Sequence, residues 1–166
     1  MISRWTHGEK IREVLQDAGL SLEQEKRAFV WNEPQAQVAV PERLMLKPLP
    51  EIGDDAFVCA IERAVEGTLD QADQEMSASE SHREIAEEHF NADKDYFGFE
   101  PEWWQLAENR EGQTVGFVQP AYFKGENKGN LKEGTVVYIG VVPEHRGHGY
   151  SVDLLFSAHS MCRLAS

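Results

Sequence analysis

The sequence predicts an α/β (α+β) protein in which a central sheet is flanked by helices. Three observations indicate this class. An apolar, β-branched run over 136–142 is followed by a glycine-containing loop and a helical pattern. Apolar residues recur at helical spacing between 54 and 69, and two strand-like segments flank a short turn between 102 and 122. Strands interleaved with amphipathic helices are typical of layered α/β and α+β domains.

The N-terminal segment is predicted to be an extension outside the main domain. Apolar residues at helical spacing predict a helix over 9–18, and Gly19 is a typical residue just past a helix end. The run 25–31 predicts a strand, and two prolines within 32–41 favour a linker. These patterns divide the chain into a helix–strand extension with a linker, 1–41, and a main domain, 42–166.

The main domain is predicted to begin with a strand and two helices. Period-2 alternation indicates the strand, apolar residues three and four apart indicate the first helix, and the second helix is charged and modestly amphipathic. An acidic loop separates the two helices, and an aromatic connection follows them. The predicted ranges are 43–49 for the strand, 54–69 and 79–90 for the helices, 70–75 for the loop and 92–101 for the connection.

A hairpin and a long loop precede the last third of the chain. Strands over 102–108 and 114–122 are predicted to pair around the turn 109–112, which ends in glycine. Trp103 and Trp104 are adjacent, so in a strand one faces the core and the other a cleft or interface. The polar, glycine-rich segment 124–134 predicts a mobile loop before the central strand.

The stretch 135–164 combines a buried strand, a loop and a buried helix. The run 136–142 is nearly continuously apolar, as in a strand covered on both faces, and Pro143 ends it because proline cannot donate to the ladder. Gly147 and Gly149 lie in the loop that follows. Apolar residues then recur at helical spacing over a wide arc: Val152, Leu155, Phe156, His159 and Cys162.

This arrangement favours anion binding. A helix N-terminus carries unpaired N–H groups and the positive end of the helix dipole. Glycines just before it let the backbone close around a phosphate without Cβ clashes, and Arg146 adds a positive charge. The stretch therefore predicts a phosphate or pyrophosphate cradle, with an ordinary strand-to-helix turn that binds nothing as the alternative.

Residues 141–150, VVPEHRGHGY, resemble motif A of the GNAT-type N-acetyltransferase superfamily, V-x-P-x-x-R-G-x-G. The resemblance implies transfer of an acetyl group from acetyl-CoA to a primary amine. It also implies that backbone N–H groups hold the pyrophosphate and that the pantetheine arm lies beside the strand end. The cofactor-binding residues it implies are Val141, Val142, Arg146, Gly147, His148, Gly149, Tyr150 and Ser151.

The resemblance also implies the topology, a mixed and mostly antiparallel sheet over about residue 43 to the C-terminus. The family continues with a strand, a helix and a closing strand after the motif helix, whereas this sequence ends at Ser166. We therefore expect a C-terminally incomplete domain with one exposed edge of the central strand. Three outcomes are open: the chain is a fragment, a second copy covers the edge as a homodimer, or the segment 25–31 closes the sheet.

Catalytic residues are harder to identify. In the family a backbone N–H of the central strand, here Val141 or Val142, binds the thioester oxygen, and a glutamate on or near that strand is commonly the base. Glu133 precedes the strand, and Tyr138 is the titratable side chain inside it, so both are candidates. The first two helices and their connection usually line the acceptor site, which implies Glu66, Asp70 and Asp73 as substrate residues, and Trp104 is a further candidate as a wall of the cleft. Solvated carboxylates and a core tryptophan are the alternatives.

Composition restricts the remaining function classes. The net charge of −13 argues against nucleic acids and anionic membranes as partners, and no run is long enough to span a bilayer. We expect Cys59 and Cys162 to be buried free thiols in a reducing cytoplasm, with no role as metal ligands. We expect His82 and His89 to be surface histidines. The competing hypothesis for the function is a non-catalytic acyl-CoA-binding or protein-interaction module that keeps the cradle.

Overall fold

The structure is a computed structural model that describes residues 8–20, 43–123 and 134–164. The chain divides into two compact units, Met1–Gln37 and Val38–Ser166, and each is described by itself. The predicted strand 25–31, the linker 32–41, the loop 124–133 and the candidate base Glu133 lie outside the described residues.

The first unit contains helix α1, Gly8–Asp17. The amide N–H of Gly19 donates to the Gln16 carbonyl at 2.9 Å, and Gly19 has a φ of 84°. A left-handed residue directly after a helix is the glycine C-cap, so the helix predicted over 9–18 is confirmed to within one residue at each end.

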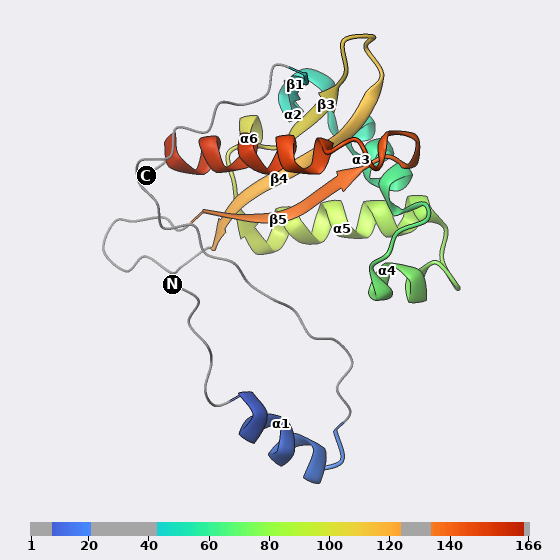
Figure 1. Cartoon of the computed structure of the whole chain (residues 1–166), viewed down its shortest axis with the longest axis vertical. Coiled ribbons are helices and arrows are strands. Elements are labelled where there is room, and N and C mark those ends of the chain that lie inside the picture. Colours follow the sequence, from blue (N-terminus) through green and yellow to red (C-terminus); the bar gives the residue numbers. More distant parts are fainter. Residues whose placement is uncertain (1–7, 21–42, 124–133, 165–166) are drawn as a thin grey trace. The chain divides into compact units, whose positions relative to one another are not determined.

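In the second unit, the described strands form one antiparallel sheet (Figure 1). The long strand β4 lies at its centre: β3 and the short β2 pair with it, β1 pairs with β3, and β5 also pairs with β4. The strands are β1 Met45–Pro48, β2 Phe97–Gly98, β3 Gln105–Glu108, β4 Thr114–Phe123 and β5 Gly134–Val141.

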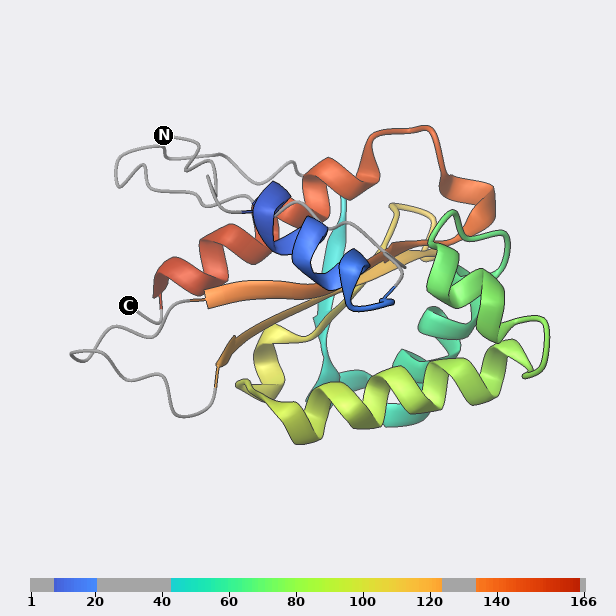
Figure 2. The ribbon, with the colours of Figure 1, turned by 90° about the horizontal axis from the view of Figure 1, so that it is seen from below.

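Helices cover both faces of this sheet (Figure 2). Helices α3 and α5 lie on one face and α6 on the other, and shorter helices occupy the connections. Their bounds are α2 Leu49–Ile52, α3 Asp54–Val65, α4 Gln71–Met76, α5 His82–Tyr96, η1 Pro101–Trp103, η2 Pro143–His145 and α6 Tyr150–Leu164. An antiparallel sheet of the described strands with helices on both faces agrees with the predicted fold class.

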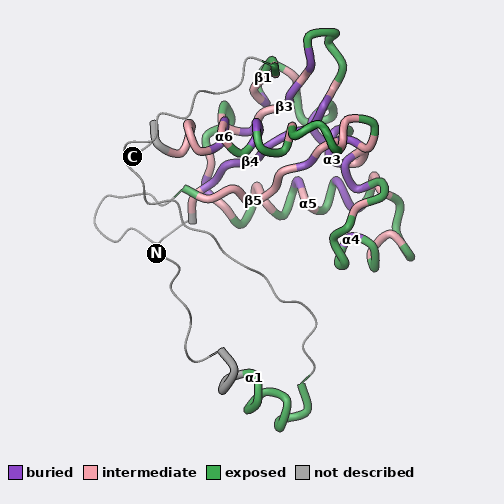
Figure 3. The backbone as a smooth tube through the Cα atoms, in the orientation of Figure 1, coloured by how far each residue is buried: buried purple, intermediate pink, exposed green. Residues whose placement is uncertain are grey.

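Two apolar clusters fill the layers, and burial is densest along β4 and α3 (Figure 3). Phe57 of α3 lies at the centre of the first cluster, where its ring stacks on Trp104 at 5.8 Å and meets Phe117 edge-on at 5.5 Å. The second cluster is smaller and packs Leu154 and Ala158 of α6 on the sheet. Aromatic burial of this kind contributes much of a small domain's stability.

A β-bulge interrupts the pairing of β4 with β5. Gln119 pairs with Tyr138 and Pro120 pairs with Val136, so Val137 is an extra residue in β5. As a result the Tyr138 side chain packs against the first apolar cluster, on the face covered by α3 and α5. The Val136 side chain packs against the second cluster, on the face covered by α6.

Several predicted boundaries are wrong for local reasons. Ser81 and Glu84 form a capping box that starts α5, and the helix continues to Tyr96 through most of the predicted aromatic connection. The predicted acidic loop contains helix α4, because the Asp70 side chain caps its N-terminus. Pro101 begins a 3-10 turn, so β3 starts at Gln105 instead of 102. Both cysteines are free, but Cys59 is exposed and not buried as predicted.

Candidate functional site

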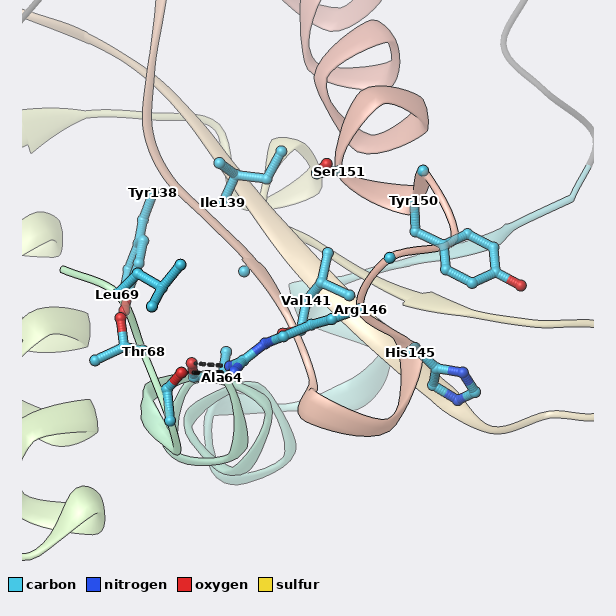
Figure 4. Close-up of a pocket in the computed structure, with 14 residues that line it drawn as sticks. Ala64, Thr68, Leu69, Tyr138, Ile139, Val141, His145, Arg146, Tyr150 and Ser151 are labelled. Atoms are coloured by element: carbon cyan, nitrogen blue, oxygen red, sulfur yellow. Dashed lines mark hydrogen bonds between the residues drawn. The ribbon is translucent and has the colours of Figure 1, made fainter.

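A groove of about 390 Å³ lies beside the C-terminal half of β5. Its walls are the end of α3 with the connection that follows, the strand from Tyr138 to Val141, and the loop that leads into α6 (Figure 4). In Figure 4, Tyr138, Thr68 and Leu69 lie at one side, and Tyr150 and His145 lie at the other.

The loop end of the groove presents backbone donors. Gly147 and Gly149 both have φ of 79°, a left-handed conformation that side chains other than glycine rarely adopt. Among the described residues, no acceptor bonds the backbone N–H groups of 147–151, and α6 begins within this run at Tyr150. Unpaired N–H groups at the positive end of a helix form an anion site.

The first predicted donor does not belong to this set. The amide N–H of Arg146 donates to the Pro143 carbonyl at 3.2 Å, which closes the 3-10 turn η2. The predicted cradle of 146–151 therefore narrows to 147–151.

The space beside the two cradle glycines is open. A Cβ built on Gly147 meets no described atom within 4 Å, and one built on Gly149 meets first the Arg43 Nη2 at 3.7 Å. Gly147, Gly149, Tyr150 and Ser151 all line the groove. His148 turns its Nδ1 to the His145 carbonyl at 3.3 Å and is exposed. The residues present are compatible with a pyrophosphate held by backbone amides.

The Arg146 side chain binds backbone carbonyls of the protein instead of adding the predicted positive charge to the anion site. Its Nη2 donates to the carbonyls of Ala64 and Glu66 at 2.9 and 2.8 Å, and its Nη1 to that of Gly67 at 2.8 Å. Its Nε donates to the Val141 carbonyl at 3.1 Å. Figure 4 shows the side chain extended towards Ala64. The guanidinium thus caps the C-terminus of α3 and fastens it to β5.

A second arginine, Arg43, lies against the cradle, and sequence reasoning missed it. It forms an ion pair with the buried Asp153 of α6, and its Nη1 donates to the His148 carbonyl at 3.3 Å. Its guanidinium carbon lies 5.1 Å from the centre of the Tyr150 ring, and its side chain is half exposed. Arg43 is 100 residues and more from these partners, so no local motif identifies it.

Nearby, Glu144 does not add an unpaired negative charge to the cradle. It is salt-bridged to Arg63 of α3. Its own backbone N–H, more than that arginine, lowers the pKa of its carboxyl group.

The structure distinguishes the two predicted donors for a thioester oxygen. Val142 is fully buried, and its N–H donates to the Val115 carbonyl at 3.0 Å on the β4 side. Because successive residues of a strand point their backbone groups in opposite directions, the N–H of Val141 points away from β4. The Val141 carbonyl also points away from β4, because it accepts a hydrogen bond from the Arg146 side chain. Val142 is therefore excluded as this donor, whereas Val141 lines the groove.

The predicted acceptor-site residues Glu66, Asp70, Asp73 and Trp104 do not line the groove. Trp104 is a core residue, because it is fully buried, stacks on Phe99 at 4.2 Å, and donates its Nε1–H to the Pro120 carbonyl at 3.2 Å. Asp70 uses its carboxylate to accept the N–H groups of α4, at 2.9 Å from Ala72. Glu66 is exposed at the C-cap of α3.

Tyr138 does line the groove, and it joins a polar cluster that sequence reasoning missed. Its hydroxyl donates to the Asp73 Oδ2 at 3.4 Å, and the Asp73 Oδ1 lies 3.0 Å from the His89 Nε2. Burial, followed by the charge of Asp73, raises the pKa of the Tyr138 hydroxyl far above its usual value. Tyr138 therefore remains protonated and cannot itself serve as an anionic base. His89 is not the plain surface residue that was predicted.

Metal and membrane sites are not found in the described part of the chain. No group of three or more His, Cys, Asp or Glu side chains among those residues could hold a metal ion. No helix within the described ranges is both long and apolar enough to cross a membrane.

Comparison with known proteins shows a likeness to a solved structure. No protein-family model matches the sequence, and no curated protein does. The crystal structure of a GCN5-related N-acetyltransferase from Sphaerobacter thermophilus is similar, with a TM-score of 0.52 and 17% sequence identity over 96% of this chain. The match covers 45% of that protein, so the chain spans less than half of its length. At this identity the likeness shows the fold alone: the chain has the fold of a GCN5-related N-acetyltransferase.

Proposed function

We propose that this chain transfers the acetyl group of acetyl-CoA to a primary amine. The observation that carries the proposal is the set of unbonded N–H groups at 147–151, at the start of α6 and facing a groove beside β5. The name of the structural neighbour, an N-acetyltransferase, supports it. The acceptor amine is proposed by chemical class only.

Each part of the groove then has a task. The amides of 147–151 bind the pyrophosphate, and Arg43 keeps the loop in place through the His148 carbonyl. The outward N–H of Val141 is the proposed donor to the thioester oxygen, which becomes more negative as the amine attacks. Acetyl-CoA supplies the activated acyl group, and the acidic surface, with a net charge of −13, favours a cationic acceptor.

Calorimetry with CoA and a thiol-release assay test this proposal. CoA should bind, inorganic pyrophosphate should compete with it, and acetyl-CoA should release thiol when an alkyl diamine, an aromatic amine or a lysine peptide is added. Absence of CoA binding would overturn the proposal. CoA binding without thiol release would favour the competing acyl-CoA-binding or interaction module.

The proposal extends to partners and compartment. Within the described residues β5 pairs with β4 alone, so its outer edge is open to a second copy, and we propose a homodimer in a cytoplasmic setting without nucleic-acid or membrane partners. Sedimentation at micromolar concentration should show a dimer, and a stable monomer would contradict this part.

A further inference from the structure

Tyr138, which lines the groove opposite the cradle, belongs to a hydrogen-bonded chain of three side chains from three elements. Tyr138 comes from β5, Asp73 from α4 and His89 from α5. The contacts run from the Tyr138 Oη to the Asp73 Oδ2 at 3.4 Å and from the Asp73 Oδ1 to the His89 Nε2 at 3.0 Å. The tyrosine and histidine rings also contact each other, with centres 5.2 Å apart.

Burial varies along this chain in a way that suits proton transfer. Tyr138 lines the groove, the Asp73 side chain is only 8% exposed, and the His89 side chain is 33% exposed. The aspartate is thus shielded from bulk water and held from both sides. A hydrogen bond of 3.4 Å is long for two oxygens, but catalytic hydrogen bonds often shorten when substrate closes the site.

We propose that Tyr138, Asp73 and His89 form the proton relay that accepts the proton lost by the attacking amine. The inference rests on the proposed function and assigns the base that sequence reasoning left open. Tyr138 contacts the amine as the catalytic residue, and Asp73 and His89 act through it as positioning residues.

The proton balance is simple. A cationic acceptor first releases its ammonium proton to solvent. The neutral amine nitrogen then forms the C–N bond as the C–S bond of the thioester breaks, and the departing thiolate takes a proton from water, which leaves a hydroxide that the proton later returned from Asp73 neutralises. The amine gives its N–H proton to the Tyr138 Oη while the Tyr138 O–H proton moves to the Asp73 Oδ2. Tyr138 remains neutral throughout, and the proton on Asp73 returns to solvent by the reverse route after the product leaves.

His89 holds the acceptor in place during this exchange. Its Nε2–H donates to the Asp73 Oδ1, which leaves Oδ2 directed at Tyr138. Other charges act on the same hydroxyl: Asp70, at the start of α4, and Asp93 on α5 also raise the Tyr138 pKa. Burial raises the Asp93 pKa as well.

The side-chain amide of Gln119 is a further polar group next to Tyr138. It is fully buried, it pairs with Tyr138 across β4 and β5, and neither atom of its amide has a hydrogen-bond partner among the described residues. A buried amide without partners is costly, so a polar group of the substrate or a water bound beside Tyr138 would be stabilised there.

Kinetics of conservative variants test the relay. Tyr138→Phe keeps the ring against Phe117 and removes one hydroxyl, so kcat should fall about 100-fold while the KM for acetyl-CoA stays unchanged. Asp73→Asn should cause a similar fall, and the double variant should be no slower than either single one, because the residues act as a unit. His89→Gln, which retains a donor, should keep more activity than His89→Ala.

A matched control and a spectroscopic measurement separate the relay from mere packing. Tyr96→Phe removes a hydroxyl from an exposed tyrosine and should not change kcat. In the protein without CoA, ¹³C NMR of the tyrosine Cζ should show Tyr138 ionising at lower pH in Asp73→Asn than in the parent, since Asp73 raises its pKa.

The outcomes are distinguishable. Unchanged Tyr138 ionisation in Asp73→Asn, or full kcat in Tyr138→Phe, overturns the relay while CoA binding still stands. A parent chain that binds CoA and releases no thiol with any amine also overturns it. A parent chain that does not bind CoA overturns the proposed function, even if NMR shows that Asp73 and Tyr138 are coupled.

Discussion

The two walls of the groove are built on opposite principles. The cradle uses backbone N–H groups from one continuous segment, 147–151, and depends on glycine conformation. At the opposite wall the side chain of Tyr138 lines the groove, and folding brings Asp73 to its hydroxyl and His89 to Asp73 from two other elements. The cradle should therefore tolerate most side-chain changes except at its glycines, whereas single-atom changes should disable the other wall.

Substitution of a cradle glycine should give the largest effect. In Gly147→Val the β-branched side chain occupies the open space beside the amides, and the φ of 79° disfavours valine. Loss of two charge-assisted hydrogen bonds corresponds to an increase of about 100-fold or more in the Kd for CoA. Calorimetry measures the Kd, and circular dichroism verifies folding.

Gly112→Val is the matched control for that variant. Gly112 has a φ of 75° in the β3–β4 turn, and no described atom lies within 4 Å of its built Cβ. It should therefore carry similar backbone strain but leave CoA affinity intact. Equal CoA affinity in both variants would contradict the cradle.

Removal of the α3 cap should give the next largest effect, on stability. Arg146→Ala leaves the carbonyls of Ala64, Glu66 and Gly67 without their donor, and we expect a loss of about 2–3 kcal/mol in the free energy of unfolding. Urea denaturation measures this, with Arg110→Ala in the exposed hairpin turn as control. Unchanged stability together with strongly weakened CoA binding would show that Arg146 faces the phosphate after all.

An alkaline loss of stability should report on the buried wall. The Tyr138 pKa is raised in the folded state above its ordinary value of 10.0, so its protonated form is favoured by folding. That contribution is complete below pH 10 and is lost as pH rises towards the folded pKa, since only the unfolded chain ionises. Between pH 9 and 11 the parent should lose about 1.4 kcal/mol more than Tyr138→Phe. Equal losses in urea titrations would contradict the assignment.

The smallest effect separates capping from substrate binding at Asp70. Asp70→Ala should cost about 1 kcal/mol, because the α4 N-cap is lost, whereas Asp70→Asn keeps a capping oxygen and should be nearly neutral. The KM for the amine should stay unchanged in Asp70→Asn. A raised KM at constant stability would show that the carboxylate contacts a cationic acceptor.

The difference between the two walls also explains which parts of the site can be predicted from the sequence. Strand, proline, glycines and helix follow one another along the chain, so a local pattern was enough to predict the cradle and the order of elements around it. Asp73 and His89 are 16 residues apart and lie 65 and 49 residues before Tyr138, and no local spacing connects them. Arg43 was missed for the same reason.

Two other predictions were wrong or incomplete because side-chain packing, which a sequence pattern does not show, determines the outcome. Alternation along a strand predicts that one of Trp103 and Trp104 faces the core but does not say which. The 3-10 turn at Pro101 places Trp104 in the core, against Phe57. Arg146 is suited to a phosphate by its charge, but its guanidinium donates to the carbonyls at the end of α3.

The bulge at Val137 determines which face of the sheet the flanking side chains of β5 reach. It lets Val136 and Ile139, three positions apart, pack on the α6 face, with Tyr138 on the opposite face. Without the bulge, Val136 and Tyr138, two positions apart, would share a face. Deletion of Val137 would make them adjacent and keep them on opposite faces, whereas one residue inserted or deleted between Tyr138 and Val141 would turn one of these two side chains to the wrong face. In evolution or engineering, β5 should therefore accept exchanged side chains more readily than an inserted or deleted residue, because the distance from relay to cradle is set by a fixed number of positions.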